Sequence, residues 1–452
     1  MANDGKKDKK TVLLEKPELN NLRLLFGLNM FLLIALFVMP QYFGIHIIWD
    51  ITCSRFANIL ITIYALVNRK VLYIFIKTAL RCPIKIPLLL YLLVTFYTMV
   101  LRVDINAFML PFLEILTFFM LMFAIRYVIG INRAFRTIIG CAYFLSIYGL
   151  IEFATGISFY QKFLKTIPAS VANSVRSGYY RIMGPCGHAL GYGLLLLLLI
   201  PIVCVDYKKN KVFLYKRPFL MIMLLANVFL TGSRSSLALA AIEVLFITFI
   251  SDKEQRKKSI YFTVGIFIFF VFLLAVFYKT RIANYIIMQI AILFDTVFDT
   301  QLAVQFGAEV NRLKDSENYR SFLPYIFTLD WLNPLLGRGI KRGFAGRVTN
   351  SAGQSATIKS VDNYYICQYI KYAYPGLFSY LSYIIISIKE MIKGLFGYRY
   401  QPIKVLLIGF ICYYVNLWWV DALQTLKFVY AYAALFFAII LYYKDIDKKE
   451  EA

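Results

Sequence analysis

A polar turn, Thr-Gly-Ser-Arg-Ser-Ser at residues 231–236, lies in the middle of an apolar run that covers residues 219–250. The run holds about 32 residues, whereas one membrane-spanning helix needs about 20. Basic residues flank the run on both sides, and positively charged loops stay in the cytoplasm. The run is therefore predicted to be a hairpin of two short helices, with its turn recessed in a cavity that opens away from the cytoplasm.

Arg234 in this turn is the first candidate functional residue. A guanidinium group at membrane depth is costly, and it is retained where it has a partner and faces the protein interior or water. The alternative is that Arg234 anchors a helix end by extending its charge toward the interface.

Composition assigns the chain to the all-α polytopic membrane proteins. Its 452 residues are 60% hydrophobic, with a mean hydropathy of +0.66. The net charge of +24 lies mostly in short loops between apolar runs, so the cytoplasmic preference of positive loops explains it and a nucleic-acid partner is not expected. Two histidines and seven scattered cysteines without a Cys-x-x-Cys pair predict no metal site, no cofactor and no disulfide framework.

Loop charges predict twelve spans with both termini in the cytoplasm. The second span is predicted near residues 54–67, followed by a cytoplasmic loop at 68–85, and residues 102–106 form a short outer turn. The absence of a sequence repeat disfavours transporter folds built from duplicated halves. The predicted parts are a cytoplasmic tail (1–23), spans one to nine (24–277), a large extracytoplasmic loop (278–361), spans ten to twelve (362–443) and a second cytoplasmic tail (444–452).

Fixed cations gather on the predicted outer side. Guanidinium groups bind phosphate oxygens in pairs and stay charged, and glycine lets backbone N–H groups approach an anion closely. A diphosphate ligand would explain the cations, and contact with lipid headgroups or simple loop solubility would also explain them. They are Arg176 and Arg181 before span six, with His188 after them, and Arg320, Arg338, Lys341, Arg342 and Arg347 in the large loop, where glycines punctuate residues 337–346.

Carboxylates on the same side could supply a base. An acceptor hydroxyl is a poor nucleophile until a positioned base takes its proton. Asp362 stands at the start of span ten and is followed by Asn363, a pair that could equally cap the helix. Glu152 lies at membrane depth, which makes it either functional or one half of a salt bridge between helices. Tyr319 could stack on a sugar ring or belong to an interfacial belt.

Four motifs follow one another across roughly residues 150–390. They are Arg-x-x-Gly-Pro at 181–185, Thr-x-Ser-Arg at 231–234, Arg320 ahead of Asn-Pro-Leu-Leu-Gly-x-Gly at 333–339, and Asp-Asn-Tyr at 362–364 opening a helix that contains Gly376. In order and spacing the chain resembles the O-antigen polymerase and O-antigen ligase superfamily, which assembles bacterial cell-surface polysaccharides.

The resemblance implies a C-type glycosyltransferase of the bacterial cytoplasmic membrane. Such an enzyme uses glycans carried on undecaprenyl diphosphate, needs no metal and acts on the extracytoplasmic face. Arg234 and Arg320 would hold the diphosphate leaving group, and the residue before Asn363 would serve at the acceptor hydroxyl. Further substrate contacts would come from Arg176, Arg181, Ser233, Tyr319, Arg338, Arg342, Asn363, His188 and Glu152.

One departure from the family bears on the choice of reaction. Ligases of this superfamily resemble one another in having histidine where this chain has Asp362, so the resemblance favours a polymerase of O-antigen, capsule or exopolysaccharide. Its partners would be lipid-linked glycan donor and acceptor, the bilayer and a chain-length regulator. A ligase that moves finished polymer to another acceptor is the nearest alternative. An exporter of lipid-linked oligosaccharide is a second one, although exporters carry charges along a path from both sides.

Overall fold

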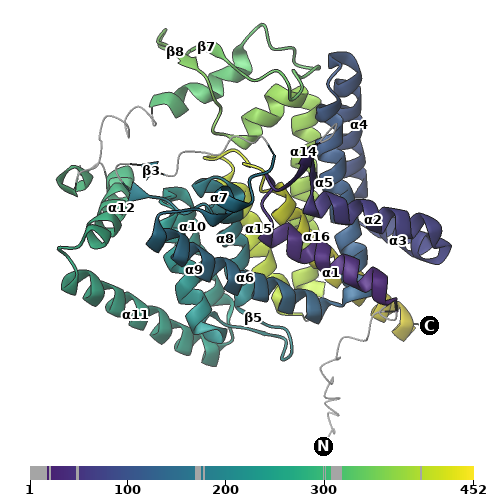
Figure 1. Cartoon of the computed structure of the whole chain (residues 1–452), viewed down its shortest axis with the longest axis horizontal. Helices are drawn as coiled ribbons and strands as arrows, with labels where there is room; N and C mark the ends of the chain where they lie inside the picture. The colour runs from purple at the N-terminus through teal and green to yellow at the C-terminus, as the bar shows by residue number, and fades with distance from the viewer. Residues whose placement is uncertain are drawn as a thin grey trace, which may run out of the picture.

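The structure is a computed structural model, and helices dominate it (Figure 1). Its few strands form short two-stranded antiparallel hairpins: β1 (Gly44–His46) with β2 (Asp50–Thr52), β3 (Val175–Arg176) with β4 (Tyr179–Tyr180), β5 (Val205–Asp206) with β6 (Lys211–Val212), and β7 (Gly346–Thr349) with β8 (Ser355–Ile358). The residues that the structure describes are 18–19, 22–46, 50–167, 175–176, 179–298, 300, 302–306, 318–397 and 400–451.

Each of the twelve predicted spans coincides with a helix. These helices are α1 (Arg23–Val38), α2 (Cys53–Val67), α4 (Lys85–Arg102), α5 (Ile105–Phe123), α6 (Ile131–Thr155), α8 (Ala189–Val203), α9 (Pro218–Leu230), α10 (Arg234–Ile250), α11 (Lys253–Val276), α14 (Tyr364–Gly397), α15 (Pro402–Asn416) and α16 (Leu426–Glu451). The hairpin predicted from the turn at 231–236 is therefore confirmed as α9 and α10.

Not all of these helices are long enough to cross a bilayer unaided. Within the described residues, five are long and apolar enough, and a sixth is added if α2 and the next helix, which are bent by 114°, count as one span. The 13 residues of α9 rise only about 20 Å, against a hydrocarbon core of about 30 Å. A helical, membrane-embedded protein is thus supported, and twelve crossings stay a prediction.

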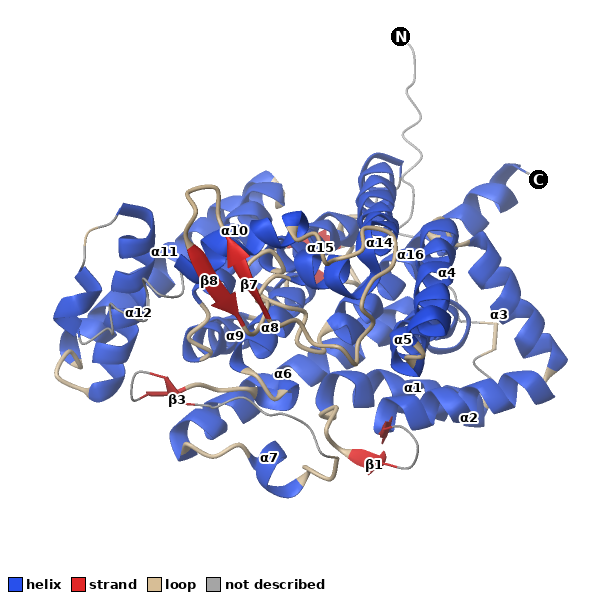
Figure 2. Cartoon of the chain, turned by 90° about the horizontal axis from the view of Figure 1, so that it is seen from above, coloured by secondary structure: helices blue, strands red, loops and turns tan. Residues whose placement is uncertain are grey.

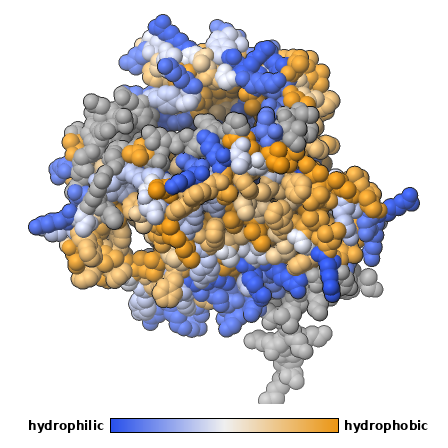
Figure 3. Space-filling view, in the orientation of Figure 1, coloured by the Kyte–Doolittle hydropathy of each residue, from blue (hydrophilic) through white to orange (hydrophobic). Residues whose placement is uncertain are grey.

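Hydrophilic surface and the connections between helices both gather at the two opposite ends of the bundle. Apolar side chains extend across the middle of the face in Figure 3, with hydrophilic ones gathered above and below them. Predicted outer connections bond to each other, as in Ile167 N–H to Tyr42 O at 3.0 Å. At the other end, Arg81 and Arg126 both pair with Asp445, at 2.5 and 2.9 Å. The connections contact one another in the two groups that alternating spans predict.

The centre of the bundle is α8, whose leucine-rich sequence is buried on every side. A helix that is apolar all round has no face to offer water, so it is enclosed by other helices. It packs against α6, α9, α10 and α15, while α5 packs against α16 and α4 against α14. This arrangement brings the starts of α8, α10 and α14 to one end of the bundle.

Two segments predicted to be loops contain helices. Residues 68–85 hold α3 (Arg69–Arg81), which Asn68 caps by accepting the Val71 N–H at 3.3 Å. The segment forms a helix and not the predicted loop, because its apolar side chains recur at helical spacing between Lys and Arg and give α3 one apolar face. The large loop holds α12 (Arg281–Phe298), with Tyr285, Met288 and Ile292 buried in a small cluster.

The remaining described elements are short. They are the helix α7 (Phe159–Phe163), a π-helical turn η1 (Ala124–Ile129) that continues α5, and the 3₁₀ turns η2 (Gly184–Cys186), η3 (Leu214–Lys216), η4 (Leu302–Phe306) and η5 (Leu323–Thr328). Figure 2 looks onto the end that carries β7 and β8, with α11 and α12 at one edge and α2 and α3 at the opposite edge.

Candidate functional site

The turn between α9 and α10 is buried. Thr231 and Ser233 are 0% and 2% exposed, which agrees with the predicted recessed position. The Ser233 hydroxyl caps α10 by accepting the Ser236 N–H at 3.4 Å. Gly232 has a φ of +60°, which favours glycine. Arg234 is therefore the first residue of α10, and it directly follows a closely packed turn.

The Arg-x-x-Gly-Pro segment binds directly to this turn. The side chain of Arg181 is buried, and its Nε–H donates to the Thr231 carbonyl at 2.7 Å. The Ile182 N–H donates to the Leu230 carbonyl at 3.2 Å. Two motifs that lie about 50 residues apart in sequence therefore form one unit at the start of α10.

Glu152 holds the same segment from the end of α6. Its carboxylate is fully buried and accepts hydrogen bonds from the Tyr180 hydroxyl at 3.0 Å, the Met183 N–H at 3.1 Å and the Gly184 N–H at 3.0 Å. The alternative prediction of a salt bridge is wrong for the described residues, because its partners are backbone and phenolic donors. Glu152 is thus a positioning residue for the segment that carries Arg181.

A methyl group at residue 232 should disrupt this unit. The Cβ of Gly232→Ala would lie 2.7 Å from the Tyr285 hydroxyl and 3.1 Å from Arg181 Nε, and the left-handed backbone adds about 1–2 kcal/mol of strain. We expect a lower unfolding temperature in thermal denaturation of the purified protein. Gly265→Ala is the matched control, because no atom of the described residues lies within 4 Å of its new Cβ. Equal unfolding temperatures in both variants would contradict the packing described here.

The starts of α10 and α14 meet at the turn that follows α15. The Asn416 side-chain amide donates to the Ser236 hydroxyl of α10 at 3.0 Å. The next two residues bond to α14: the Leu417 carbonyl accepts the Tyr364 N–H at 3.0 Å, and the Trp418 carbonyl accepts the Asn363 side-chain amide at 2.8 Å. Residues 416–418 therefore bridge the helix that begins at Arg234 and the helix that Asp362 precedes.

Asp362 and Asn363 have different positions at the start of α14. Asn363 caps α14, because its side-chain oxygen accepts the Ile366 N–H at 3.0 Å. Asp362 is exposed beside it. Burial raises the pKa of the Tyr319 hydroxyl, and the neighbouring Asp362 carboxylate adds to the rise. Arg320 follows Tyr319, and its buried Nε makes no hydrogen bond within the described residues.

The glycine-rich run at residues 337–346 was predicted to bring backbone N–H groups to a ligand anion, but in the structure these groups bind other parts of the chain. Its N–H groups at Ile340 and Lys341 bind an anion, but that anion is the Asp104 carboxylate of this chain, at 2.6 and 2.8 Å. The N–H groups of Arg338 and Gly339 bond to the carbonyls of Ile370 and Lys371 in α14, just before the non-helical residue Ala373. The run thus fastens the loop to the outer turn at 102–106 and to the break in α14.

Arg338 and Arg342 are not shown to contact Arg181 or Asp362, whereas His188 lies close to Arg181. The guanidinium of Arg338 lies 4.8 Å over the Trp331 ring, and Arg342 is exposed. His188 caps α8, its Nδ1 accepting the Leu190 N–H at 3.0 Å. Arg176 belongs to β3, and its side chain lies outside the described residues.

No protein-family model and no curated protein matches this sequence. The resemblance to the O-antigen polymerase and ligase superfamily therefore rests on the four motifs, and three of them meet around the starts of α10 and α14.

Sequence analysis missed two polar features of the interior. Asn227 of α9 is fully buried, donates to the Ser146 carbonyl at 2.9 Å and accepts from the Tyr192 hydroxyl at 3.2 Å. The facing Gly149 leaves room for it. The second feature is a polar pocket whose wall includes Arg55, Glu114 and Lys427. Isolated charges within long apolar runs were the available signal for this pocket.

Proposed function

We propose that this chain is a membrane glycosyltransferase that polymerises oligosaccharide repeat units carried on undecaprenyl diphosphate. The product would be O-antigen, capsule or exopolysaccharide. The protein would cross the bacterial cytoplasmic membrane twelve times, and the reaction would occur on the extracytoplasmic face.

The observation that carries the proposal is the bridge at residues 416–418. It connects the helix start that bears Arg234 to the helix start preceded by Asp362, with hydrogen bonds of 2.8–3.0 Å. Tyr319 contributes to the same neighbourhood through its proximity to Asp362, and Arg320 is its neighbour in sequence. A fixed cation and a carboxylate near one another are what a displacement reaction with an anionic leaving group needs.

The proposed step is direct inverting displacement. A hydroxyl oxygen of the acceptor glycan attacks the anomeric carbon of the donor glycan while the bond from that carbon to the diphosphate oxygen breaks. The electron pair of the broken bond leaves with undecaprenyl diphosphate, whose charge Arg234 and Arg320 stabilise. The hydroxyl proton goes to the Asp362 carboxylate. Arg181 and Glu152 keep the turn before Arg234 in position.

A deletion strain would separate the three reactions considered. Loss of the polymerase should leave single repeat units on undecaprenyl diphosphate in the outer leaflet and remove long lipid-linked chains. Accumulation of finished, untransferred polymer would instead establish a ligase. Accumulation of repeat units in the cytoplasmic leaflet would establish an exporter and refute the proposal. The measurement is mass spectrometry of extracted lipid-linked glycans, combined with leaflet-specific labelling.

A further inference from the structure

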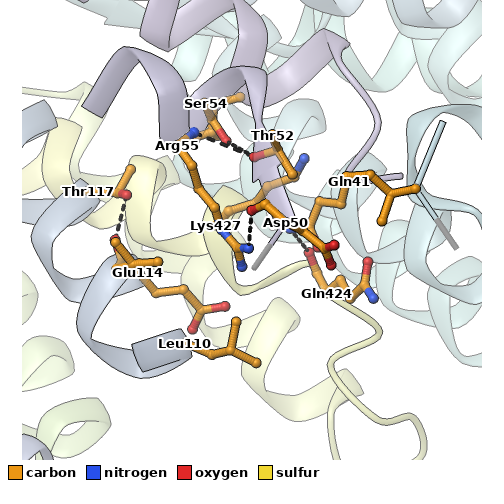
Figure 4. A pocket seen from close by; sticks show the side chains of 13 residues that line it. Gln41, Asp50, Thr52, Ser54, Arg55, Leu110, Glu114, Thr117, Gln424 and Lys427 are labelled. Carbon is orange, nitrogen blue, oxygen red and sulfur yellow. Dashed lines mark hydrogen bonds between the residues drawn. The ribbon is translucent and has the colours of Figure 1, made fainter. Parts of the chain in front are cut away.

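A polar pocket lies where α1, α2, α5 and α16 approach one another, on the side of the predicted outer connections. Its cavity volume is about 200 Å³, less than a site for a drug-sized ligand. Arg55 comes from α2, Glu114 from α5 and Lys427 from α16 (Figure 4). Leucine and isoleucine side chains form the apolar part of the wall.

The cations in this pocket retain unused donors. Arg55 donates to the Asp50 carbonyl at 2.7 Å, although a guanidinium has five N–H groups. Lys427 is only 8% exposed, and its ammonium group donates to the Met39 carbonyl at 3.3 Å. Within the described residues, no carboxylate oxygen lies within 4 Å of either cation, although Arg55 is attracted by the Asp50 and Glu114 carboxylates of the same pocket. Lys427 is buried and Arg55 half-buried, and cations with spare donors in such positions are costly unless an acceptor reaches them.

The backbone around the pocket adds to its positive character. Helix α2 begins at Cys53 with Thr52 as its cap, and α16 begins at Leu426, so both positive helix ends face the same region as Arg55 and Lys427. Against them, the Glu114 carboxylate lies near Arg55 and attracts its charge. The Asp50 carboxylate bonds instead to His46, at 2.7 Å.

The pocket is also bordered by unusual backbone. Leu423 and Gln424, which precede α16, have φ values of 45° and 63°, a left-handed conformation that non-glycine residues rarely adopt. The Gln41 side-chain amide donates to the Gln424 carbonyl at 3.0 Å. Such backbone persists where surrounding contacts hold it, and it concentrates at functional sites.

We infer that this pocket binds a phosphoryl group, with Arg55 and Lys427 donating to its oxygens. A phosphoryl group is rich in acceptors and negatively charged, which matches two cations with spare donors, one buried and one half-buried, and two helix N-termini. Glu114 would face the ligand as a repulsive neighbour and limit its affinity. The site is distinct from the proposed diphosphate contacts at Arg234 and Arg320, and it does not depend on the reaction proposed above.

The test measures binding in a background that removes the other proposed phosphate site. Full-length protein carrying Arg234→Ala and Arg320→Ala is purified in a maltoside detergent and titrated calorimetrically with inorganic pyrophosphate in one arm and phosphatidylglycerol in the other. We expect saturable binding in at least one arm. Binding of pyrophosphate would show that the pocket takes a free phosphate. Binding of phosphatidylglycerol alone would show that it takes the phosphate of a lipid headgroup.

Variants of the pocket test whether its positive charges favour binding and its negative charge opposes it. Arg55→Gln and Lys427→Met should each weaken binding by about tenfold or more. Lys427→Arg should retain binding, and Glu114→Gln should strengthen it because a repelling charge is removed. Lys162→Met, at an exposed cation of α7, should leave binding unchanged.

Two results would overturn the inference. Absence of binding in both arms would leave a pocket that holds only water. Weaker binding in Glu114→Gln, of the same size as in Lys427→Met, would mean that Glu114 accepts from the ligand, as it would from a neutral sugar. Because Glu114→Gln is expected to gain affinity, a variant that merely fails to fold cannot imitate the expected result.

Discussion

Replacing Arg234 or Arg320 by alanine should abolish formation of long glycan chains while leaving the amount of membrane-inserted protein unchanged. Loss of one preorganised group that stabilises leaving-group charge typically costs about 10²–10³ in rate. Arg234 begins α10 beside the buried turn, and Arg320 follows the tyrosine that lies near Asp362. Gel electrophoresis of extracted polysaccharide measures chain length, and immunoblotting of membranes measures the protein.

Two further variants separate specific recognition from net charge. Arg234→Lys keeps the charge but loses paired hydrogen bonding to phosphate, so we expect shorter chains than in the wild type. Arg347→Ala removes an exposed arginine of β7 in the large loop and should leave chain length unaltered. Wild-type chain lengths in Arg234→Ala or in Arg320→Ala would remove that arginine from the reaction.

Replacing Glu152 by alanine should have the largest effect on stability. The change leaves the N–H groups of Met183 and Gly184 without their acceptor in a buried position, together with the Tyr180 hydroxyl. Unsatisfied buried donors cost about 1–3 kcal/mol each. The segment bearing Arg181 should then detach from the turn at Thr231, so both the unfolding temperature and polymer formation should fall.

Two comparisons make the Glu152 prediction specific. Glu152→Gln keeps one acceptor oxygen and should recover part of the lost stability. Glu254→Ala removes an exposed glutamate that pairs with Lys258, and exposed pairs contribute about 0–1 kcal/mol. If Glu152→Ala unfolds at the same temperature as Glu254→Ala, the carboxylate does not hold the segment as described.

The sequence predicted the helical runs well because membrane insertion imposes a strong, local signal. Runs as uniform as that of α8 need no tertiary information, and the polar turn at 231–236 is readable as a hairpin from its charged flanks alone. The sequence did not establish which of these helices cross the bilayer. The helix α9, for example, is too short to do so by itself. The helix α3 differs from the predicted loop because Lys and Arg interrupt its apolar positions, and α12 lies within the segment that loop charges assigned to the large external loop.

The candidate site was less predictable, since its hydrogen bonds join residues far apart in sequence. Ser233, Asn363 and His188 each cap a helix, which residue type allows but does not distinguish from ligand binding. The role of Glu152 depends on backbone N–H groups about 30 residues later, and backbone donors leave no trace in a sequence. The bridge through Asn416 and Trp418 lies outside all four motifs, so no pattern pointed to it.

Elongation by the purified protein tests the central claim most directly. The full-length chain is incubated with synthetic undecaprenyl-diphosphate repeat units, and the products are resolved by mass spectrometry. The proposal predicts lipid-linked chains that lengthen by whole repeat units, at a rate greatly reduced in Asp362→Asn. Repeat units that remain single with the wild-type protein, under conditions where it is folded, would contradict the assignment as a polymerase.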